Sequence, residues 1–582
     1  ILTDVVNKGT ISGTNNDIAG IAAEAEEGVE LVRCGNEGKI ICNGNQKSYI
    51  AGLIAESGPI TMEECYNKGN IEIIDIDNTK YVAGLIAYAK STSSRKQTMT
   101  LTGCYNEGDI VGSAVVAGLI ANTDASGTVT NPLILTECYN TGNITARPTK
   151  TQSSTGAPTA GLVALYTPGS KFTNCRNSGT ISTTNINTGG ITAYYKTTPK
   201  EDNPVVISNC HNTGTIESDG NNIGGIIAYS TDYTTTENCY NTAELKGSFG
   251  IGGIAGYING VTSTLKSCWN SGKVTIATNR GGGLVGLGSK GVVESSFNVG
   301  DVISLSTEVG TDKTSGYGIG GLAGQGTAVF TDCYNMGIVT GANQVGGLVG
   351  VPRSGHTQII RCYNAGKIVA QSDECGSLIG ADLSDSYWNS ENKVESSYFV
   401  TDYGTHHNDT IGTTITIAEL AKTDMGNGWT AGDDYTLPIP TTQISEPYAL
   451  INAVTIAFAE GDSKNSITKD FFVGAPEGVN WTSSVANISF SGFNALFDDK
   501  ECIGKATLTA TAGELNKTFE INCNKPSGIN DILNGKIVVK EVYYNTYGIE
   551  VPKPTSHDSN VYMVVRTYDD GTTDTLKFFN VK

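Results

Sequence analysis

One short pattern recurs along roughly the first two thirds of this chain and limits the folds open to it. It reads C-Y-N-x-G-x-I at residues 65–71 and returns, with variations, at spacings of 28 to 39 residues. A second pattern stands between the copies, such as A-G-L-I-A at residue 51 or G-G-L-V-G at residue 282. Such fixed-order recurrence predicts a solenoid, in which each repeat buries its apolar face against its neighbours. The asparagines of the first pattern are Asn7, Asn36, Asn67, Asn106, Asn140, Asn177, Asn212, Asn241, Asn270, Asn298, Asn335 and Asn364.

The repeated segments have the composition of β-strands. They are short, rich in Ile, Val, Thr and Tyr, and separated by Gly, Asn and Ser, and none shows a sustained helical period with caps. We predict three short strands and three turns in each repeat, stacked into parallel sheets with equivalent residues about 4.8 Å apart. Because crossovers between parallel strands are right-handed, the expected fold is a right-handed parallel β-helix of about twelve coils.

A cysteine stands two residues before the asparagine in most copies, where a metal ligand, a disulfide or a nucleophile has to be considered. Val5 and Ser296 take its place in two copies, so the position accepts small side chains that are not thiols. The chain has no C-x₂-C pair for zinc. In-register neighbours also keep their Cβ atoms farther apart than a disulfide allows. We predict an inert, buried and reduced thiol ladder, with disulfides between strands as the alternative.

The asparagine and the glycines are predicted to specify the fold rather than any chemistry. An inward amide at a bend can bond to the amides of the copies above and below it. The glycine that follows it in the pattern is expected to supply a positive φ at the turn. In G-G-L-V-G the glycines are expected to permit close approach of the backbone while the leucine fills the interior.

The alternation of G-G-L-V-G with C-Y-N-x-G-x-I resembles the GLUG motif of large bacterial surface and secreted proteins, over roughly residues 1–380. The segment 386–422, from S-Y-W-N to A-E-L-A-K, resembles the portion that closes such arrays. The resemblance implies an adhesin-like protein, and some members carry an immunoglobulin A peptidase beside the array. That zinc enzyme needs H-E-x-x-H, and no histidine of this chain is followed by Glu, so this chain does not carry it.

From about residue 440 the repeats stop and alternating strand patterns begin. The segment 440–525, with Trp481 expected in its core, resembles a bacterial immunoglobulin-like sandwich. Within it Cys502 and Cys523 are equidistant from Ala512-Gly513. A two-residue turn there would place the cysteines opposite each other, at a distance that a disulfide accepts. We predict that disulfide, and a bulge that leaves two thiols is the alternative.

Residues 530–582 resemble the C-terminal sorting module of the type IX secretion system. The resemblance rests on Y-Y-N-x-x-G-x-E-V at 543–551 and Y-M-V-V-R-T-Y-D-D-G-T-T at 562–573, with a hairpin expected around Asp570-Gly571. It implies export across an outer membrane and display at the cell surface. The predicted domains are the repeat solenoid with its closing segment (1–425), the sandwich (440–525) and the sorting-like module (530–582).

Composition argues against some partners. The net charge is −20 and the pI about 4.7, so nucleic acids and anionic membranes, which need clustered Lys and Arg, are not expected. No apolar run approaches the length of a membrane span. Residue 1 lies inside a repeat, so we expect further sequence before it, where a signal peptide or a lipoprotein cysteine would stand.

Few residues suggest chemistry. The acids of D-I-D-N at 75–78 and the D-D pairs at 433, 498 and 569 do not recur on adjacent repeats, and His356 is expected in a loop. The glycine-rich stretch at 284–291 lacks the G-K-S/T ending and the helix of a phosphate loop. The aromatic residue after the ladder cysteine is expected to point outward, where it either stacks on sugars or packs against its neighbours. These residues are Tyr66, Tyr105, Tyr139, Tyr240, Trp269, Tyr334 and Tyr363.

We therefore predict an all-β, non-enzymatic protein that is secreted or displayed on a bacterial surface as an adhesin-like stalk. No catalytic, metal-ligating or cofactor-binding residue is assigned. The expected partners are glycans or proteins of a host or matrix. A glycan-binding module is the alternative, and a carbohydrate-active β-helix enzyme is less favoured.

Overall fold

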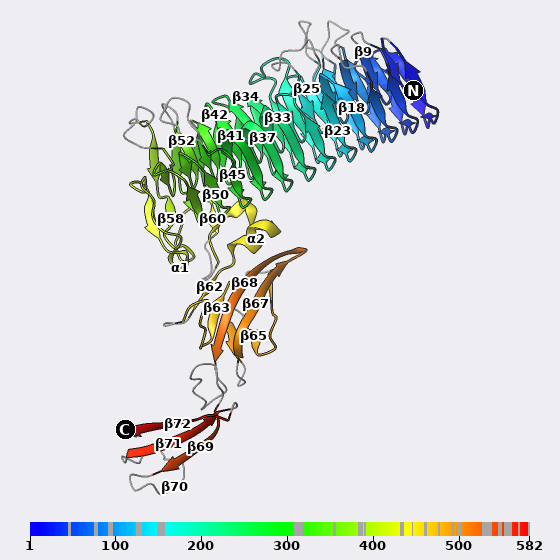
Figure 1. Cartoon of the computed structure of the whole chain (residues 1–582). Coiled ribbons are helices and arrows are strands. Elements are labelled where there is room, and N and C mark those ends of the chain that lie inside the picture. The colour runs from blue at the N-terminus through cyan, green and yellow to red at the C-terminus, as the bar shows by residue number, and fades with distance from the viewer. Residues whose placement is uncertain are drawn as a thin grey trace. The chain divides into compact units, whose positions relative to one another are not determined.

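In the computed structural model the regular secondary structure is almost entirely β-strand, and the chain divides into two compact units (Figure 1). Unit 1 comprises residues 1–431 and 438–445, and unit 2 comprises residues 432–437 and 446–582. The structure describes residues 1–14, 16–44, 48–74, 80–90, 97–123, 131–147, 157–307, 318–326, 328–352, 357–381, 388, 391–430, 436–444, 446–458, 462–474, 478–491, 494–497, 502–525, 538–544, 550–551, 561–568 and 571–579.

Unit 1 is a parallel β-solenoid of about eleven turns. Four sheets run along it, with 13 strands in sheet A, 14 in sheet B, 21 in sheet C and 11 in sheet D. The predicted stack of parallel strands is thus confirmed, and its right-handed winding stays a prediction. One turn passes through β11 (Thr61–Glu63) in sheet A, β12 (Tyr66–Asn67) in B, β13 (Ile71–Ile73) and β14 (Lys80–Ala83) in C, and β15 (Ile86–Ala89) in D.

The prediction of three strands per turn is wrong, because the chain forms four sheets and visits sheet C twice. Two short strands, such as β13 and β14, enter sheet C where a connecting segment separates them. In shorter turns one long strand replaces the pair, as in β33 (Ile216–Gly224) and β41 (Val274–Gly282). The isoleucine or valine that ends the first pattern begins that longer strand, as Ile216 and Val274 do.

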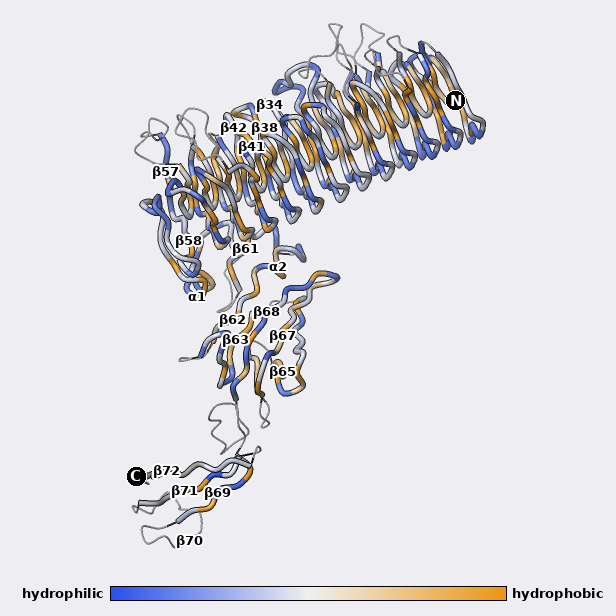
Figure 2. Tube along the Cα trace, viewed as in Figure 1, coloured by the Kyte–Doolittle hydropathy of each residue, from blue (hydrophilic) through white to orange (hydrophobic). Residues whose placement is uncertain are grey.

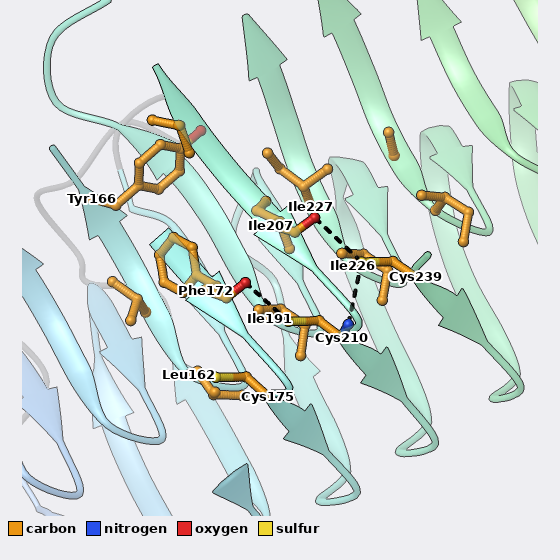
Figure 3. Close-up of a cluster of buried hydrophobic side chains, with 14 of the residues drawn as sticks. Leu162, Tyr166, Phe172, Cys175, Ile191, Ile207, Cys210, Ile226, Ile227 and Cys239 are labelled. Carbon is orange, nitrogen blue, oxygen red and sulfur yellow. Dashed lines mark hydrogen bonds between the residues drawn. The ribbon is translucent and has the colours of Figure 1, made fainter. Parts of the chain in front are cut away.

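Hydrophobic clusters fill the interior of the solenoid, and two of those formed by the described residues are large. The larger contains the ladder cysteines, the leucines of the second pattern and the inward residues of sheet A, and the other contains the isoleucines and valines of sheet C. Figure 3 shows Cys175, Cys210 and Cys239 in successive turns of the larger cluster. All the cysteines of the ladder are buried, unbridged thiols, as predicted. Figure 2 shows hydrophobic positions recurring at the same place in successive turns.

The asparagines form a continuous hydrogen-bonded ladder. Each Nδ2 donates to the carbonyl oxygen two residues ahead, as Asn67 does to Gly69 at 2.8 Å. It also donates to Oδ1 of the asparagine in the next turn, at 2.7–2.9 Å along the whole series from Asn7 to Asn364. The predicted role of this residue is confirmed.

The glycine after each asparagine acts differently from the prediction. Gly69 and its counterparts do not have a positive φ. Instead, a Cβ on Gly69 would lie 2.0 Å from the carbonyl oxygen of Gly38 in the preceding turn. A Cβ on Gly84, in the second pattern, would lie 2.1 Å from the carbonyl oxygen of Gly118 and 2.6 Å from Oδ1 of Asn106. The glycines of the second pattern therefore pack against the asparagines of the first pattern, so the two motifs meet in the interior of the solenoid.

Positive φ occurs instead one residue before the ladder cysteine, at the corner between sheets A and B. There φ is 51° at Arg33, 56° at Glu137 and 47° at Ser295. We call these positions the corner row. They are Asp4, Arg33, Glu64, Gly103, Glu137, Asn174, Asn209, Asn238, Ser267, Ser295, Asp332, Arg361 and Ser396. Their side chains differ so much that no motif marked them.

The segment after the repeats closes the solenoid and then returns along it. The strands β57 (Lys393–Glu395), β58 (Tyr398–Val400) and β59 (Thr413–Ile415) extend sheets A and B. The helix α1 (Ile417–Leu420) follows, with a capping box between Thr416 and Glu419.

The returning part consists of β60 (Trp429–Thr430), β61 (Ile439–Pro440), which pairs with it antiparallel, and the 3₁₀ turn η1 (Thr441–Gln443). We call residues 426–430 and 438–444 the strap.

The second segment of unit 2 begins with α2 (Pro447–Ala453), and two antiparallel sheets follow. One holds β62 (Ile456–Ala457), β63 (Phe471–Val473), β66 (Asn494–Phe497) and β65 (Ile488–Ser491), and the other holds β64 (Asn480–Ser483), β67 (Cys502–Ala512) and β68 (Leu515–Lys525). A hydrophobic cluster that includes Phe471, Leu508 and Ile521 joins strands of both sheets, and Trp481 packs against it.

The predicted register of the β67–β68 hairpin is wrong by two residues. Ala512 pairs with Leu515, so the two-residue turn is Gly513-Glu514. Cys502 therefore lies opposite Lys525, Cys523 lies opposite Gly504, and both cysteines are buried free thiols. The physical reason is that Gly513, at φ 59°, takes the first turn position rather than the second.

The last sheet of unit 2 holds β70 (Glu550–Val551), β69 (Val538–Tyr544), β71 (Val561–Tyr568) and β72 (Thr573–Phe579). β71 and β72 form the predicted hairpin, although Asp570 lies outside the described residues. Within the described parts of the chain, no helix has the length and apolar character needed to cross a membrane.

Candidate binding surface

The residue after each ladder position forms an outward row on sheet B. The row consists of the first residues of the short strands that carry the asparagine, paired in register from turn to turn. We call it the aromatic row. It contains Tyr66, Tyr105, Tyr139, Arg176, His211, Tyr240, Trp269, Phe297, Tyr334 and Tyr363. The sequence identified seven of these residues, and register alone adds Arg176, His211 and Phe297.

The rings of the aromatic row stack face to face along the solenoid. Ring centroids are 4.8 Å apart for Tyr105 and Tyr139, with an interplanar angle of 1°. They are 4.4 Å apart for Tyr240 and Trp269, with an angle of 3°. In-register parallel strands impose this spacing. Most ring faces are therefore covered by neighbouring rings, and the row presents ring edges and hydroxyl groups to its surroundings.

Two cationic or titratable residues stand among the tyrosines of the row, and each packs against a neighbouring ring. The Arg176 guanidinium lies 4.1 Å from the ring centroid of Tyr139, a cation–π contact. The His211 ring stacks on Tyr240 at 4.7 Å and 1°. Burial, and then the charge of Arg176, lowers the pKa of His211 below its ordinary value.

Charges beside the N-terminal part of the row are paired. The Lys68 ammonium lies 5.3 Å and 5.6 Å from the ring centroids of Tyr66 and Tyr105. It also pairs with Glu107 at 3.3 Å, and this contact is the main cause of the raised pKa of Lys68. The Tyr66 hydroxyl donates to Glu37 at 3.2 Å. This end of the row therefore carries no large excess charge of one sign.

The C-terminal half of the row is covered by the strap. Trp269, Phe297, Tyr334 and Tyr363 are all at most 4% exposed. The ring centroid of Trp429 lies 5.5 Å from that of Tyr363. The Tyr363 hydroxyl donates to the carbonyl oxygen of Pro438 at 3.0 Å.

The strap also binds the corner row. Trp429 Nε1 donates to Asp332 Oδ1 at 2.8 Å, and Arg361 donates to both carboxylate oxygens of Asp332, at 2.7 and 2.9 Å. Gln443 Nε2 donates to the carbonyl oxygen of Ser295 at 3.0 Å. Two turns earlier along the stack from the Asp332 turn, Ser267 Oγ donates to Thr442 Oγ1 at 3.0 Å.

The N-terminal half of the row, from Tyr66 to Tyr240, stays accessible. Its aromatic rings are half-buried and Arg176 is exposed. The corner residues beside it include three exposed asparagines, Asn174, Asn209 and Asn238. We call Tyr66, Tyr105, Tyr139, Arg176, His211 and Tyr240 the open half of the aromatic row.

A second aromatic group lies on sheet D, where the sequence reading missed it. Tyr229 meets Tyr257 at 4.7 Å and 75°, and Tyr194 at 5.0 Å and 69°. Asn259 Nδ2 donates to the Tyr229 hydroxyl at 2.9 Å, and Ser289 donates to Asn259. The signal was present in I-T-A-Y-Y, I-I-A-Y-S and I-A-G-Y-I, where a tyrosine follows the second pattern.

The ladder thiols are unsuited to chemistry. Cys239 Sγ donates to the carbonyl oxygens of Ile207 and Glu237, at 3.6 and 3.2 Å. Burial raises the pKa of Cys239 and of Cys333 well above the ordinary thiol value. All the ladder thiols are 0% exposed, so a substrate or metal ion in solution cannot reach them, and reactive cysteines are at least partly accessible.

Of the other residues weighed for chemistry, those that the structure describes give no assembled site. The acids at 75–78, 433–434, 498–499 and 569–570, and His356, lie outside the described residues. The stretch at 284–291 includes β42 (Val285–Gly288) of sheet D rather than a phosphate loop. Glu217, Asp219 and Lys246 line a hollow of about 530 Å³ on sheet C, where both acids are exposed. Among the described residues, no group of three His, Cys, Asp or Glu side chains is placed to hold a metal ion.

Comparison of this chain with protein-family profiles, with curated proteins and with solved structures finds no match in any of the three.

Proposed function

We propose that this protein is a non-enzymatic stalk, secreted or displayed on a bacterial surface, that mediates attachment to a host or matrix. One observation carries the proposal. The interior of the solenoid is occupied throughout by ladders that hold its turns together, and the asparagine ladder alone links the turns from Asn7 to Asn364 with bonds of 2.7–2.9 Å. A rod of this kind holds a surface at a distance from its point of attachment.

The sequence resemblances support the same role. The GLUG-like repeats point to bacterial surface proteins, and residues 530–582 resemble a type IX sorting module that delivers proteins to the cell surface. We place an immunoglobulin-like module between them, over residues 440–525. The proposed location is therefore extracellular or on the outer-membrane surface.

Attachment is tested with the purified chain coated on beads and offered to immobilised matrix proteins and a glycan array. Saturable retention by one class of surface, abolished when the chain is unfolded by heat before coating, is the expected result. Release of new reducing ends from pectins by the same preparation would instead make the protein an enzyme. Retention on every surface to the same extent, heated or not, would contradict specific attachment.

A glycan-binding module is the second candidate, and the tyrosines of sheet D favour it. Tyr229 meets Tyr194 and Tyr257 edge to face, so these rings do not form the continuous face-to-face stack of the aromatic row. Tyr229 and Tyr257 are half-buried, and sugars stack on accessible aromatic rings. The test is glycan binding by Tyr229→Ser and Tyr257→Ser variants. Loss of glycan binding in both, with unchanged far-ultraviolet circular dichroism, is expected if sugars bind there.

A further inference from the structure

The strap shows which chemistry the aromatic row binds. Residues 426–430 and 438–444 contain no charged side chain. The strap contributes a tryptophan ring against the tyrosine rings, a proline carbonyl that accepts from a tyrosine hydroxyl, and polar side chains that bond to the corner row. It thus covers ring edges and hydroxyl groups, which are the parts that a face-to-face stack leaves accessible.

The open half continues the covered half in register. Tyr240 pairs with Trp269, and their rings stack at 4.4 Å, so the two halves form one unbroken surface. The corner row continues too, with exposed Asn174, Asn209 and Asn238 in place of Ser267, Ser295 and Asp332. Side-chain amides both donate and accept hydrogen bonds, as the groups of a peptide backbone require.

The same geometry disfavours a sugar. A sugar ring stacks on an open aromatic face, and most faces in the open half are occupied by neighbours at 4.7–5.4 Å or, at Tyr139, by the Arg176 guanidinium. A peptide needs no free face, because the strap binds without one.

We infer that the open half of the aromatic row binds an extended polypeptide segment of a partner protein, with the chemistry of the strap: uncharged, proline-containing and carrying an aromatic side chain. This inference rests on the proposed attachment function and names its partner as a protein.

The probe is a fluorescent synthetic peptide that joins residues 426–430 to residues 438–444 through a short Gly-Ser linker, so that it is uncharged like the strap. It is added to the full chain and followed by fluorescence anisotropy. Saturable binding at one site is expected. A peptide with Trp429→Ala should bind at least about tenfold more weakly, because it lacks the ring that packs against the tyrosines. Equal binding of both peptides would overturn the inference.

Variants of the full chain locate the binding site. Tyr105→Ser with Tyr139→Ser should weaken peptide binding at least about tenfold, and Arg176→Gln serves as a milder variant that spares the rings. The matched control is Tyr229→Ser with Tyr257→Ser, which removes two half-buried tyrosines from sheet D and should leave peptide binding unchanged. Equal losses in both double variants, or no loss in the first, would overturn the inference.

Further outcomes separate the alternatives. If binding is unaffected by the open-half variants but enhanced by Trp429→Ala in the chain, the peptide replaces the strap and the inference fails. If the open-half variants lose glycan binding and no peptide binds, the occupant is a sugar and the inference also fails.

Beads that attach to a matrix protein equally well with the open-half variants would overturn the inference and leave the attachment function standing. Peptide binding without attachment to any surface would overturn that function alone.

Discussion

At the scale of single residues, Asn241 has a larger share in stability than its neighbour Cys239. Asn241 Nδ2 donates to the carbonyl of Ala243 and to Asn270, and its Oδ1 accepts from Asn212. Asn241→Ala leaves these buried groups unpaired and should cost about 1–3 kcal/mol. Cys239→Ala removes one small buried group and should cost about 1 kcal/mol or slightly more. Urea unfolding measures the loss in free energy of unfolding for each variant. An equal loss in both, or a larger loss for Cys239→Ala, would contradict the role of the asparagine ladder.

A second prediction concerns the glycine beside the ladder. A Cβ on Gly272 would lie 1.9 Å from the carbonyl oxygen of Ala243. Gly272→Ala should therefore force two turns apart and cost about 1–3 kcal/mol, the range for overpacking. Ala243→Gly is the matched change at the same position of the preceding turn, where the structure already accommodates a methyl group, and should cost less. The urea midpoints of the two variants would show the reverse order if the glycine served only as a flexible hinge.

The sequence predicted the hydrogen-bonded asparagine ladder. It did not predict the close contact of the glycine or the corner row, and each omission has a physical reason. The asparagine was predictable because a buried amide must find partners, and only its own copies above and below recur at the right place. The reason for glycine at position 69 was not predictable, because a positive φ and a close approach of another backbone both require glycine. The corner row gave no signal, because an outward side chain at positive φ can be Asn, Ser, Arg or Glu, as Asn209, Ser295 and Arg361 show.

At the scale of elements, the strap should make two similar tyrosines differ in how much stability is lost when their hydroxyl group is removed. The Tyr363 hydroxyl donates to the carbonyl oxygen of Pro438. The buried Tyr334 hydroxyl has no hydrogen-bond partner in the described part of the chain. Tyr363→Phe should therefore cost about 1 kcal/mol, while Tyr334→Phe should be neutral or stabilising. Thermal unfolding of both variants provides the comparison, and equal destabilisation would contradict the contact with the strap.

The aromatic row should also make stability depend on pH. The pKa of His211 is lowered in the folded state from its ordinary value of 6.5, so the unfolded chain binds the proton more readily. The contribution of His211 is present above that value and falls as the pH drops towards and through the folded pKa. The variant His211→Tyr carries the residue of the following turn, Tyr240. Its free energy of unfolding should fall less than that of the parent between about pH 8 and about pH 5. Parallel urea titrations of variant and parent at both pH values would show no difference if His211 were not coupled to folding.

Element-level prediction was accurate for the repeats and inaccurate for the hairpin of unit 2. In the solenoid every turn repeats the same evidence, so the register of β12 on β17 (Tyr105–Asn106) follows from aligning one asparagine with the next. The β67–β68 hairpin offers a single glycine, and that residue suits either position of the turn. Placing Gly513 first rather than second moves Cys502 from Cys523 to Lys525. Most of the aromatic row was predictable from the repeats. The strap that covers its C-terminal half was not, because the strap lies after the repeats and contains no recurring pattern.

At the scale of the whole molecule, a solenoid responds to damage locally. Trp429→Ala should cost about 3–5 kcal/mol, as for a buried aromatic side chain. Because each turn contacts only its neighbours, the loss should be confined to the turns of Phe297, Tyr334 and Tyr363. Hydrogen exchange should accelerate there and stay unchanged around Tyr105. Uniform acceleration along the solenoid would mean that it unfolds as one cooperative body.

The strap has a mechanical consequence as well. The chain passes between the two units three times, after residues 431, 437 and 445. Tension applied at the C-terminus reaches the solenoid through the connection after residue 445, which follows the strap directly in the sequence. Pulled from that end, the strap meets its bonds to Ser267, Tyr363 and Asp332 one after another. These bonds lie on different turns, so the load passes to several turns in succession instead of to the last one alone, and each bond has to break before the next is loaded.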